Sequence, residues 1–172
     1  MKFQETDIAA LTFNPFEKIG SQWMLITAGS SREDCNTMTA SWGGVGIMWG
    51  KPVATAYIRP QRYTKGFVDK EEYFTLSFLP ETYRKALNIC GSVSGRDVED
   101  KWKEAGLTPF ETDGTTAVEE AEEIFVCRKL YTQEMKPECF TDGGGCDGKW
   151  YPDKDYHTMY MAEIVKVLRK VG

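Results

Sequence analysis

Short runs of apolar and alternating residues dominate the chain, and they predict a mainly β protein. The run WMLITA at 23–28 is continuously apolar and rich in β-forming residues, which is typical of a buried strand. YFTLSFL at 73–79 alternates aromatic and polar residues, as a strand with two different faces does. Strands that follow one another across short turns favour an antiparallel sheet. We expect strands at 23–28, 36–42, 52–58, 73–79, 124–135 and 157–168.

Helical patterns are short and lie between these strands. A helical turn is expected at 65–69, and a helix is expected to begin at Pro80 and end near Gly91. A second helix at 98–105 follows the polar run 94–97, which we expect to cap it, and Gly106 should stop it. Residues 80–108 would then form a helical insertion in the β fold.

The remaining segments are expected to be irregular. Residues 1–20 are predicted to form an N-terminal arm, 43–50 a loop or a bulged strand end, and 136–155 a glycine-rich loop. The acidic run within 112–123 is expected to be a solvent-exposed edge. With no repeat or linker in 172 residues, we expect one domain over 1–172.

A strand rich in small and polar residues precedes a stiff basic turn. The strand at 36–42 (NTMTASW) would let a flat ligand approach the backbone closely, with Trp42 as an aromatic wall. In the turn at 59–64 (RPQRYT), Pro60 fixes its own φ and keeps Arg59 extended. Two guanidinium groups and a hydroxyl suit a phosphate, which accepts several charge-assisted hydrogen bonds. A ring site beside an anion site predicts a mononucleotide ligand.

These two motifs, N-x-M-T-A-S-W and R-P-x-R-Y-T, resemble the flavin reductase-like, FMN-binding split-barrel family, and more closely its flavoredoxin-type branch. The resemblance implies an antiparallel, Greek-key split β-barrel that holds FMN. It places the ring and ribityl chain on the strand and the phosphate on Arg59, Arg62 and Thr64. The implied cofactor-binding residues are Asn36, Thr37, Met38, Thr39, Ala40, Ser41, Trp42, Arg59, Pro60, Arg62, Tyr63 and Thr64.

The chain's single histidine lies in a second segment of resemblance. The pattern D-Y-H-T-M-Y-M-A-E is similar to the family's D-H-x-h-h-h-G-E-V, with Ala162 in place of glycine and Ile164 in place of valine. The resemblance implies that His157 lies near the flavin and meets the nicotinamide as a catalytic residue. A purely structural role, in a hydrogen bond at the end of a strand, is the equal alternative.

Composition excludes several other classes of function. The net charge is −5 with no basic cluster, so no nucleic-acid partner is expected. No secretory segment or membrane-length apolar run is evident, so we expect a cytoplasmic protein without membrane contact. One histidine and scattered carboxylates show no metal-site spacing, and no metal is predicted. Cys139 and Cys146, which flank a glycine-rich run, are expected to be free thiols.

Cofactor-borne redox chemistry is therefore the favoured function. We expect hydride transfer from NAD(P)H to bound FMN and onward electron transfer to an unidentified acceptor. An FMN electron-transfer protein of the flavoredoxin kind, with little NAD(P)H activity, is the alternative, and a split-barrel relative that binds pyridoxine phosphate or haem is a third. The family pairs its barrels, so a homodimer with flavin at the interface is expected, with Trp42, Trp49 and the N-terminal arm as candidate contacts.

Overall fold

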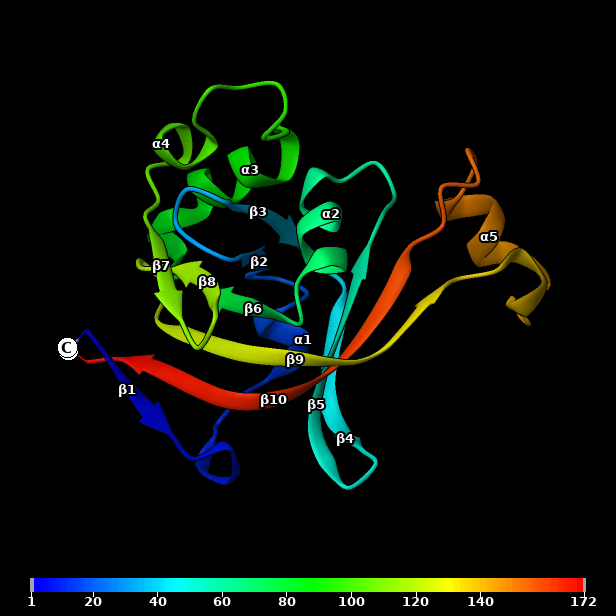
Figure 1. Cartoon of the computed structure of the whole chain (residues 1–172). Helices are drawn as coiled ribbons and strands as arrows, with labels where there is room; N and C mark the ends of the chain where they lie inside the picture. The colour runs from blue at the N-terminus through cyan, green and yellow to red at the C-terminus, as the bar shows by residue number, and fades with distance from the viewer. Residues whose placement is uncertain (1, 172) are drawn as a thin grey trace.

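An eight-stranded antiparallel sheet forms the body of the protein, in a computed structural model that describes residues 2–171 (Figure 1). Seven strands follow the order β3-β2-β6-β9-β10-β5-β4, and β1 pairs with the far end of β10. The strands of this sheet are β1 (Phe3–Thr6), β2 (Met24–Gly29), β3 (Cys35–Ala40), β4 (Gly43–Met48), β5 (Lys51–Ile58), β6 (Tyr73–Phe78), β9 (Glu123–Glu134) and β10 (Thr158–Lys170). The predicted mainly β, antiparallel fold is confirmed.

The helices are short and lie outside the barrel wall or close its ends. They are α1 (Pro15–Lys18), α2 (Tyr63–Lys70), α3 (Arg84–Ser92), α4 (Lys101–Ala105) and α5 (Gly145–Trp150), with 3-10 turns at Ile8–Ala10, Glu81–Tyr83 and Pro137–Cys139. A small hairpin of β7 (Pro109–Thr112) and β8 (Thr115–Val118) forms a separate two-stranded sheet. Within residues 2–171, none of the helices has the length and apolar character needed to span a bilayer.

The two outermost strands of the sheet meet at one corner. β3 and β4 lie at opposite ends of the strand order, yet only Ser41 and Trp42 join them in the chain. The curled sheet must therefore bring its edges together at this dipeptide, which leaves the barrel split between β3 and β4. Backbone groups and small side chains of two strands converge there, so this corner is the natural place for a ligand.

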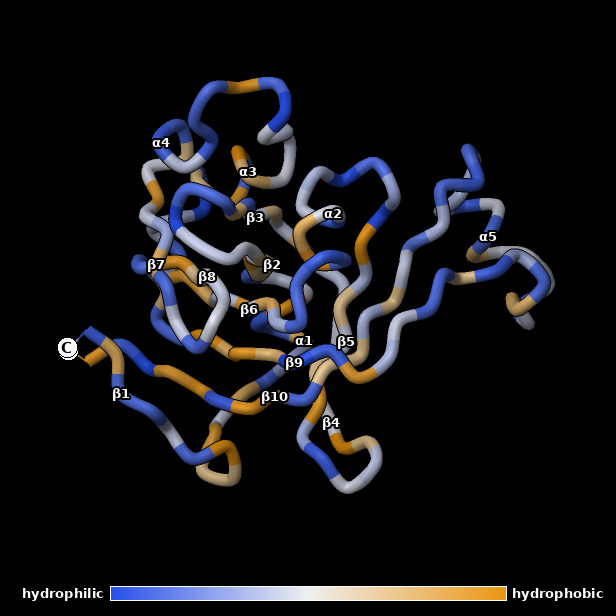
Figure 2. The backbone as a smooth tube through the Cα atoms, in the orientation of Figure 1, coloured by the Kyte–Doolittle hydropathy of each residue, from blue (hydrophilic) through white to orange (hydrophobic). Residues whose placement is uncertain are grey.

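The barrel core lies inside the curled sheet and is built from the inward faces of six strands. Its largest fully buried side chains include Tyr160, Phe74, Phe78 and Phe125. Figure 2 shows the hydrophobic positions concentrated along the central strands, with a second group at the tip of the β4–β5 hairpin. Dense packing of large apolar side chains gives the barrel a rigid wall, and this wall holds the corner in place.

Some segments differ from the sequence-based expectation. The N-terminal arm is not free, because β1 pairs with β10 from Phe3 opposite Lys170 onward. Most of the 43–50 segment is a regular strand, β4, which pairs with β5 from Gly43 to Met48, and residues 49 and 50 form the turn between the two strands. Glycines at 43, 44, 46 and 50 are typical of loops and also occur in a strand at an open edge of a sheet, so the sequence does not distinguish the two.

The helical insertion and the acidic segment also need correction. The helix expected at 98–105 begins only at Lys101, and its cap is Asp100, whose carboxylate accepts from the Lys103 amide. The segment expected to be a solvent-exposed edge contains β8, which is entirely buried against β2 and β6. Small apolar residues next to the acidic run allow this packing. Of the four glutamates of the run, Glu122 is exposed, Glu119 and Glu120 are half-buried, and Glu123 is buried. The predicted 136–155 loop contains α5, which projects from the ends of β9 and β10 (Figure 1).

Candidate functional site

A cleft of about 250 Å³ lies at the corner between β3 and β4, and we call it the β3 cleft. It brings together two motifs that are separate in the sequence, because β5 delivers the basic turn to the corner beside β3. The predicted site residues that line it are Met38, Thr39, Ala40, Ser41, Trp42, Arg59, Arg62 and His157, and Tyr57 and Trp150 complete the wall.

The other predicted site residues do not line this cleft. Asn36, Thr37 and Thr64 are buried behind it, where the Asn36 side-chain amide donates to the Thr64 hydroxyl at 2.8 Å. This hydrogen bond joins β3 to the first turn of α2 and fixes the basic turn against the strand. Pro60 and Tyr63 also lie outside the cleft lining.

Arg62 crosses from the start of α2 to the end of α3. Its two terminal nitrogens donate to the carbonyl oxygens of Gly91 at 2.7 Å and Cys90 at 3.2 Å. Burial lowers the pKa of Arg62, yet a guanidinium stays protonated at neutral pH. Within residues 2–171, the hydrogen-bond partners of this positive charge are neutral carbonyls.

Lys101 is a second buried cation, which the sequence patterns did not identify. Its ammonium donates to the carbonyl oxygens of Thr37 at 2.8 Å and Cys90 at 3.1 Å, and only 5% of the residue is exposed. Burial lowers the pKa of Lys101 to about 8. No local signal in the sequence marks Lys101, because a lysine in a short polar helix is usually solvent-exposed.

Arg62 and Lys101 therefore donate to the same atom, the Cys90 carbonyl oxygen, and we call these two side chains the cation pair. Neither side chain makes an ion pair with any residue of the described chain. The neighbouring Cys90 thiol cannot compensate, because burial raises its pKa to about 11. Two like charges in a poorly solvated place repel each other, and an anion bound nearby would relieve that repulsion.

Arg59, the other predicted phosphate ligand, is already neutralised. Its guanidinium pairs with the Asp155 carboxylate at 2.5 Å and donates to the Trp150 carbonyl at 2.7 Å. Gln61 donates to the same carboxylate. In this arrangement Arg59 connects the basic turn to the segment after α5, so its main visible effect is to position that segment.

His157 faces the cleft but carries no charge at neutral pH. Its Nδ1 atom shares a hydrogen bond of 2.8 Å with the Tyr151 hydroxyl, and its ring lies 5.1 Å from that of Trp42. Burial, with a smaller effect of Arg59, lowers the pKa of His157 to about 4. A neutral imidazole can donate or accept a hydrogen bond at the cleft, but it cannot act as a cation.

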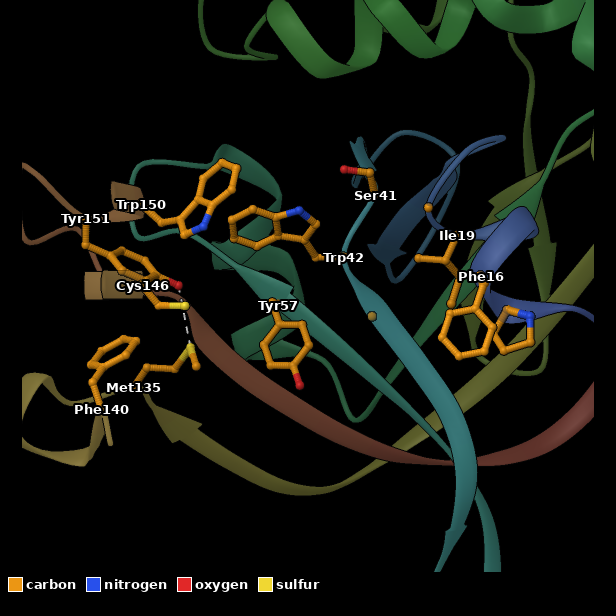
Figure 3. A pocket seen from close by; sticks show the side chains of 13 residues that line it. Phe16, Ile19, Ser41, Trp42, Tyr57, Met135, Phe140, Cys146, Trp150 and Tyr151 are labelled. Carbon is orange, nitrogen blue, oxygen red and sulfur yellow. Dashed lines mark hydrogen bonds between the residues drawn. The ribbon is translucent and has the colours of Figure 1, made fainter. Parts of the chain in front are cut away.

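A second, larger space of about 620 Å³ adjoins the β3 cleft, and we call it the aromatic compartment. Ser41, Trp42, Tyr57 and Trp150 line both spaces. Figure 3 shows Trp42 in the middle, with side chains from the α5 segment on one side and those of α1 on the other. The aromatic residues of its lining are Phe16, Trp42, Tyr57, Phe140, Trp150 and Tyr151. Sequence reasoning found only Ser41 and Trp42 in this space.

Comparison with known proteins agrees with this geometry. The model of the flavin reductase like domain matches residues 16–170, nearly the whole chain. The chain belongs to this family. No protein with a curated description matches it.

Solved structures of flavin reductase-like proteins share the fold. An FMN-binding domain of a flavin reductase-like enzyme from Shewanella baltica has 15% identity over 98% of this chain and 77% of its own, with a TM-score of 0.68. The flavoredoxin of Desulfovibrio vulgaris has 21% identity over 95% and 75%, with a TM-score of 0.64. A flavoredoxin from Methanosarcina acetivorans has 17% identity over 85% and 67%, also with a TM-score of 0.64.

The flavin reductase like family binds FMN, which confirms the cofactor predicted from the sequence. The residues present fit this molecule. Arg62 lines the β3 cleft, and Lys101 is buried outside its lining, so together they supply the positive charge that a phosphate dianion needs. The small side chains of 39–41 leave the backbone of the corner accessible to a ribityl chain, and Trp42 offers an aromatic wall to the ring.

Gly95, in the helical insertion, packs closely against residues behind the β3 cleft. A Cβ atom at this position would lie 2.5 Å from the Asn36 Oδ1 atom and 3.0 Å from the Tyr63 ring. We expect Gly95→Ala to disturb the Asn36–Thr64 hydrogen bond and to destabilise the protein by about 1–3 kcal/mol. Chemical denaturation measures this change in the free energy of unfolding.

Gly66→Ala is the matched control for that substitution. Gly66 lies inside α2, and a Cβ atom there would meet nothing within 4 Å. This variant should be more stable than the wild type by about 0.5–1 kcal/mol, because alanine favours a helix interior. Equal stability of the two variants would show that the close approach at Gly95 has no energetic importance.

Proposed function

We propose that this protein is an FMN-binding oxidoreductase that accepts hydride from NAD(P)H onto its flavin and passes the electrons to an acceptor. The observation that carries the proposal is the buried cation pair of Arg62 and Lys101, which has no acidic partner in the described chain and lies behind a cleft with an aromatic wall. Membership of a family whose proteins are generally oxidoreductases supports the reaction class.

Each part of the site has a distinct task in this proposal. Arg62 and Lys101 hold the phosphate, and the edge of β3 orients the ribityl chain. Trp42 limits the position of the ring, and the neutral His157 supplies a hydrogen bond next to it while Tyr151 holds its Nδ1 atom. Bound FMN supplies the chemistry itself, because its ring takes up a hydride and releases electrons singly or in pairs. The protein contributes binding, orientation and exclusion of water.

An FMN electron-transfer function with little direct NAD(P)H activity is the second candidate. It is favoured by the likeness in fold to the flavoredoxins of Desulfovibrio vulgaris and Methanosarcina acetivorans. It uses the same FMN site and differs only in the electron donor.

An anaerobic stopped-flow experiment separates the two candidates. Protein loaded with FMN is mixed with NADH or NADPH, and flavin absorbance is followed. Rapid, saturable bleaching with either nucleotide is the expected result. If dithionite reduces the bound flavin but both nucleotides fail, the electron-transfer candidate is correct. If no FMN binds at all, both candidates are wrong.

We also propose that the protein acts as a homodimer with flavin at the interface. The β4–β5 hairpin presents an apolar tip, at which Ile47 is 75% exposed and Trp49 57% exposed. β4 is moreover an open sheet edge that another chain can cover. We expect light scattering to show a dimer for the wild type and a shift towards monomer for Trp49→Asp, because a charge in a buried contact is costly. A wild-type monomer that still binds flavin would contradict this prediction.

A further inference from the structure

The aromatic compartment has a lining without any charge. Thirteen residues surround its 620 Å³, all of them in the described part of the chain, and none is acidic or basic. Six of the thirteen are aromatic, and Met135, Ile19 and Pro15 add further apolar surface. The adjoining β3 cleft contrasts with it, because two arginines line that smaller space.

This lining selects the chemistry of a ligand. The volume is in the range of small-molecule sites, which is about 300–1,000 Å³. Flat aromatic molecules gain from stacking and edge contacts with such walls, whereas a charged group would lose its hydration without finding a partner. Side-chain hydrogen-bonding groups are few: the Ser41, Tyr57 and Tyr151 hydroxyls, the Cys146 thiol and the indole N–H groups of Trp42 and Trp150. They suit one or two carbonyl oxygens better than a highly polar molecule.

The position of the compartment indicates what such a ligand would do. Trp42 and Tyr57 belong to both spaces, so a molecule in the aromatic compartment lies directly beside the one in the β3 cleft. If the β3 cleft holds FMN, a molecule in the aromatic compartment is within reach of electron or hydride transfer from the flavin ring.

We propose that the aromatic compartment binds a flat, uncharged, quinone-type electron acceptor. This inference rests on the proposed FMN function and names the class of acceptor for it. In the reaction, the quinone takes up a hydride from the reduced flavin anion and one proton from water. It leaves as the hydroquinone, and neutral oxidised FMN remains.

Phe16 provides the sharpest variant for a test. It lies on α1, is 87% exposed and belongs to the compartment but not to the β3 cleft, so Phe16→Asp adds a charge outside the lining of the FMN cleft and outside the core. Because the N-terminal arm is a candidate dimer contact, light scattering and FMN titration of the variant are compared with those of the wild type. Lys18→Gln is the matched control, because it changes the charge of the same helix by the same amount outside the compartment.

The experiment uses FMN-loaded protein that is photoreduced under argon and mixed with menadione, an uncharged naphthoquinone. A naphthoquinone sulfonate and ferricyanide are run in parallel. We expect the reoxidation rate to saturate with menadione and to rise without saturation with both anions. Phe16→Asp should raise the apparent dissociation constant for menadione by about tenfold or more, and Lys18→Gln by less than about twofold.

Two results would overturn the inference while leaving the FMN function intact. One is a rate that rises linearly with menadione in the wild type. The other is equal menadione kinetics in Phe16→Asp and Lys18→Gln. In both cases FMN would still bind and be reduced, which separates this failure from that of the proposed function. Absence of bound FMN would overturn both together.

Discussion

Arg62→Ala is expected to weaken FMN binding by about ten- to a hundredfold, because it removes a charge-assisted contact worth about 1.5–3 kcal/mol. The guanidinium is partly desolvated, donates to the carbonyls of Gly91 and Cys90, and makes no ion pair within residues 2–171, so its charge is not neutralised there. Titration of the apoprotein with FMN, followed by quenching of flavin fluorescence, measures the dissociation constant.

Arg59→Ala provides the internal comparison for this prediction. The charge of Arg59 is already neutralised by Asp155, so its loss should weaken FMN binding by less than about tenfold. Thermal unfolding of the two apoproteins controls for folding, since Arg62 also satisfies two carbonyls at the end of α3. Wild-type FMN affinity in Arg62→Ala, or a larger loss in Arg59→Ala, would show that the phosphate is bound elsewhere.

The affinity for FMN should fall as the pH rises above about 8, because Lys101 then loses its proton. Burial lowers its pKa from 10.5 to about 8 in the folded protein. Below that pH the ammonium is charged and attracts the phosphate, and above it the lysine must first take up a proton to do so. The dissociation constant should therefore increase by up to about tenfold per pH unit. Titrations of the apoprotein with FMN between about pH 7 and 10 measure this dissociation constant.

The contribution of Lys101 to the stability of the apoprotein should show the opposite trend in the same range. The folded pKa of Lys101 lies below the unfolded value of 10.5, so the unfolded chain binds more protons between about pH 8 and 10.5. Stability from this group therefore rises with pH across that window, by about 1–2 kcal/mol after allowance for solvent screening. The thiols of Cys35 and Cys90 act in the opposite direction above about pH 9, because burial raises their pKa from 9.0 to about 11, so the contribution of Lys101 is measured as the difference between the wild type and Lys101→Met.

Lys101→Met is the variant that assigns both trends to this side chain. It keeps the length and the apolar stem of lysine and has no titratable group. Its FMN affinity at neutral pH should be about ten- to a hundredfold weaker than that of the wild type. Both the affinity and the relative stability should lose the steep pH dependence above pH 8. A wild-type pH profile in Lys101→Met would exclude Lys101 from the phosphate site.

Local pattern was sufficient for much of this protein. Apolar runs and alternation identified the main strands, since the period of side chains along a strand is a local property. The two motifs at 36–42 and 59–64 identified the family and its cofactor, because each motif is a short contiguous stretch that can be recognised in the sequence alone. Local pattern did not show that β1 completes the sheet, that 43–50 is a strand, or that β8 is buried, because these features depend on distant neighbours.

For the site, sequence alone predicted the segments that carry the proposed ligand chemistry, namely a small-residue strand, a basic turn and an aromatic wall. Only the tertiary structure decided how charge is distributed among them. Lys101 reaches the Thr37 carbonyl across 64 residues of chain and becomes the partner of Arg62, whereas Arg59 is neutralised by Asp155. Charge balance and burial depend on which distant segments the barrel brings together, and no local pattern contains that information.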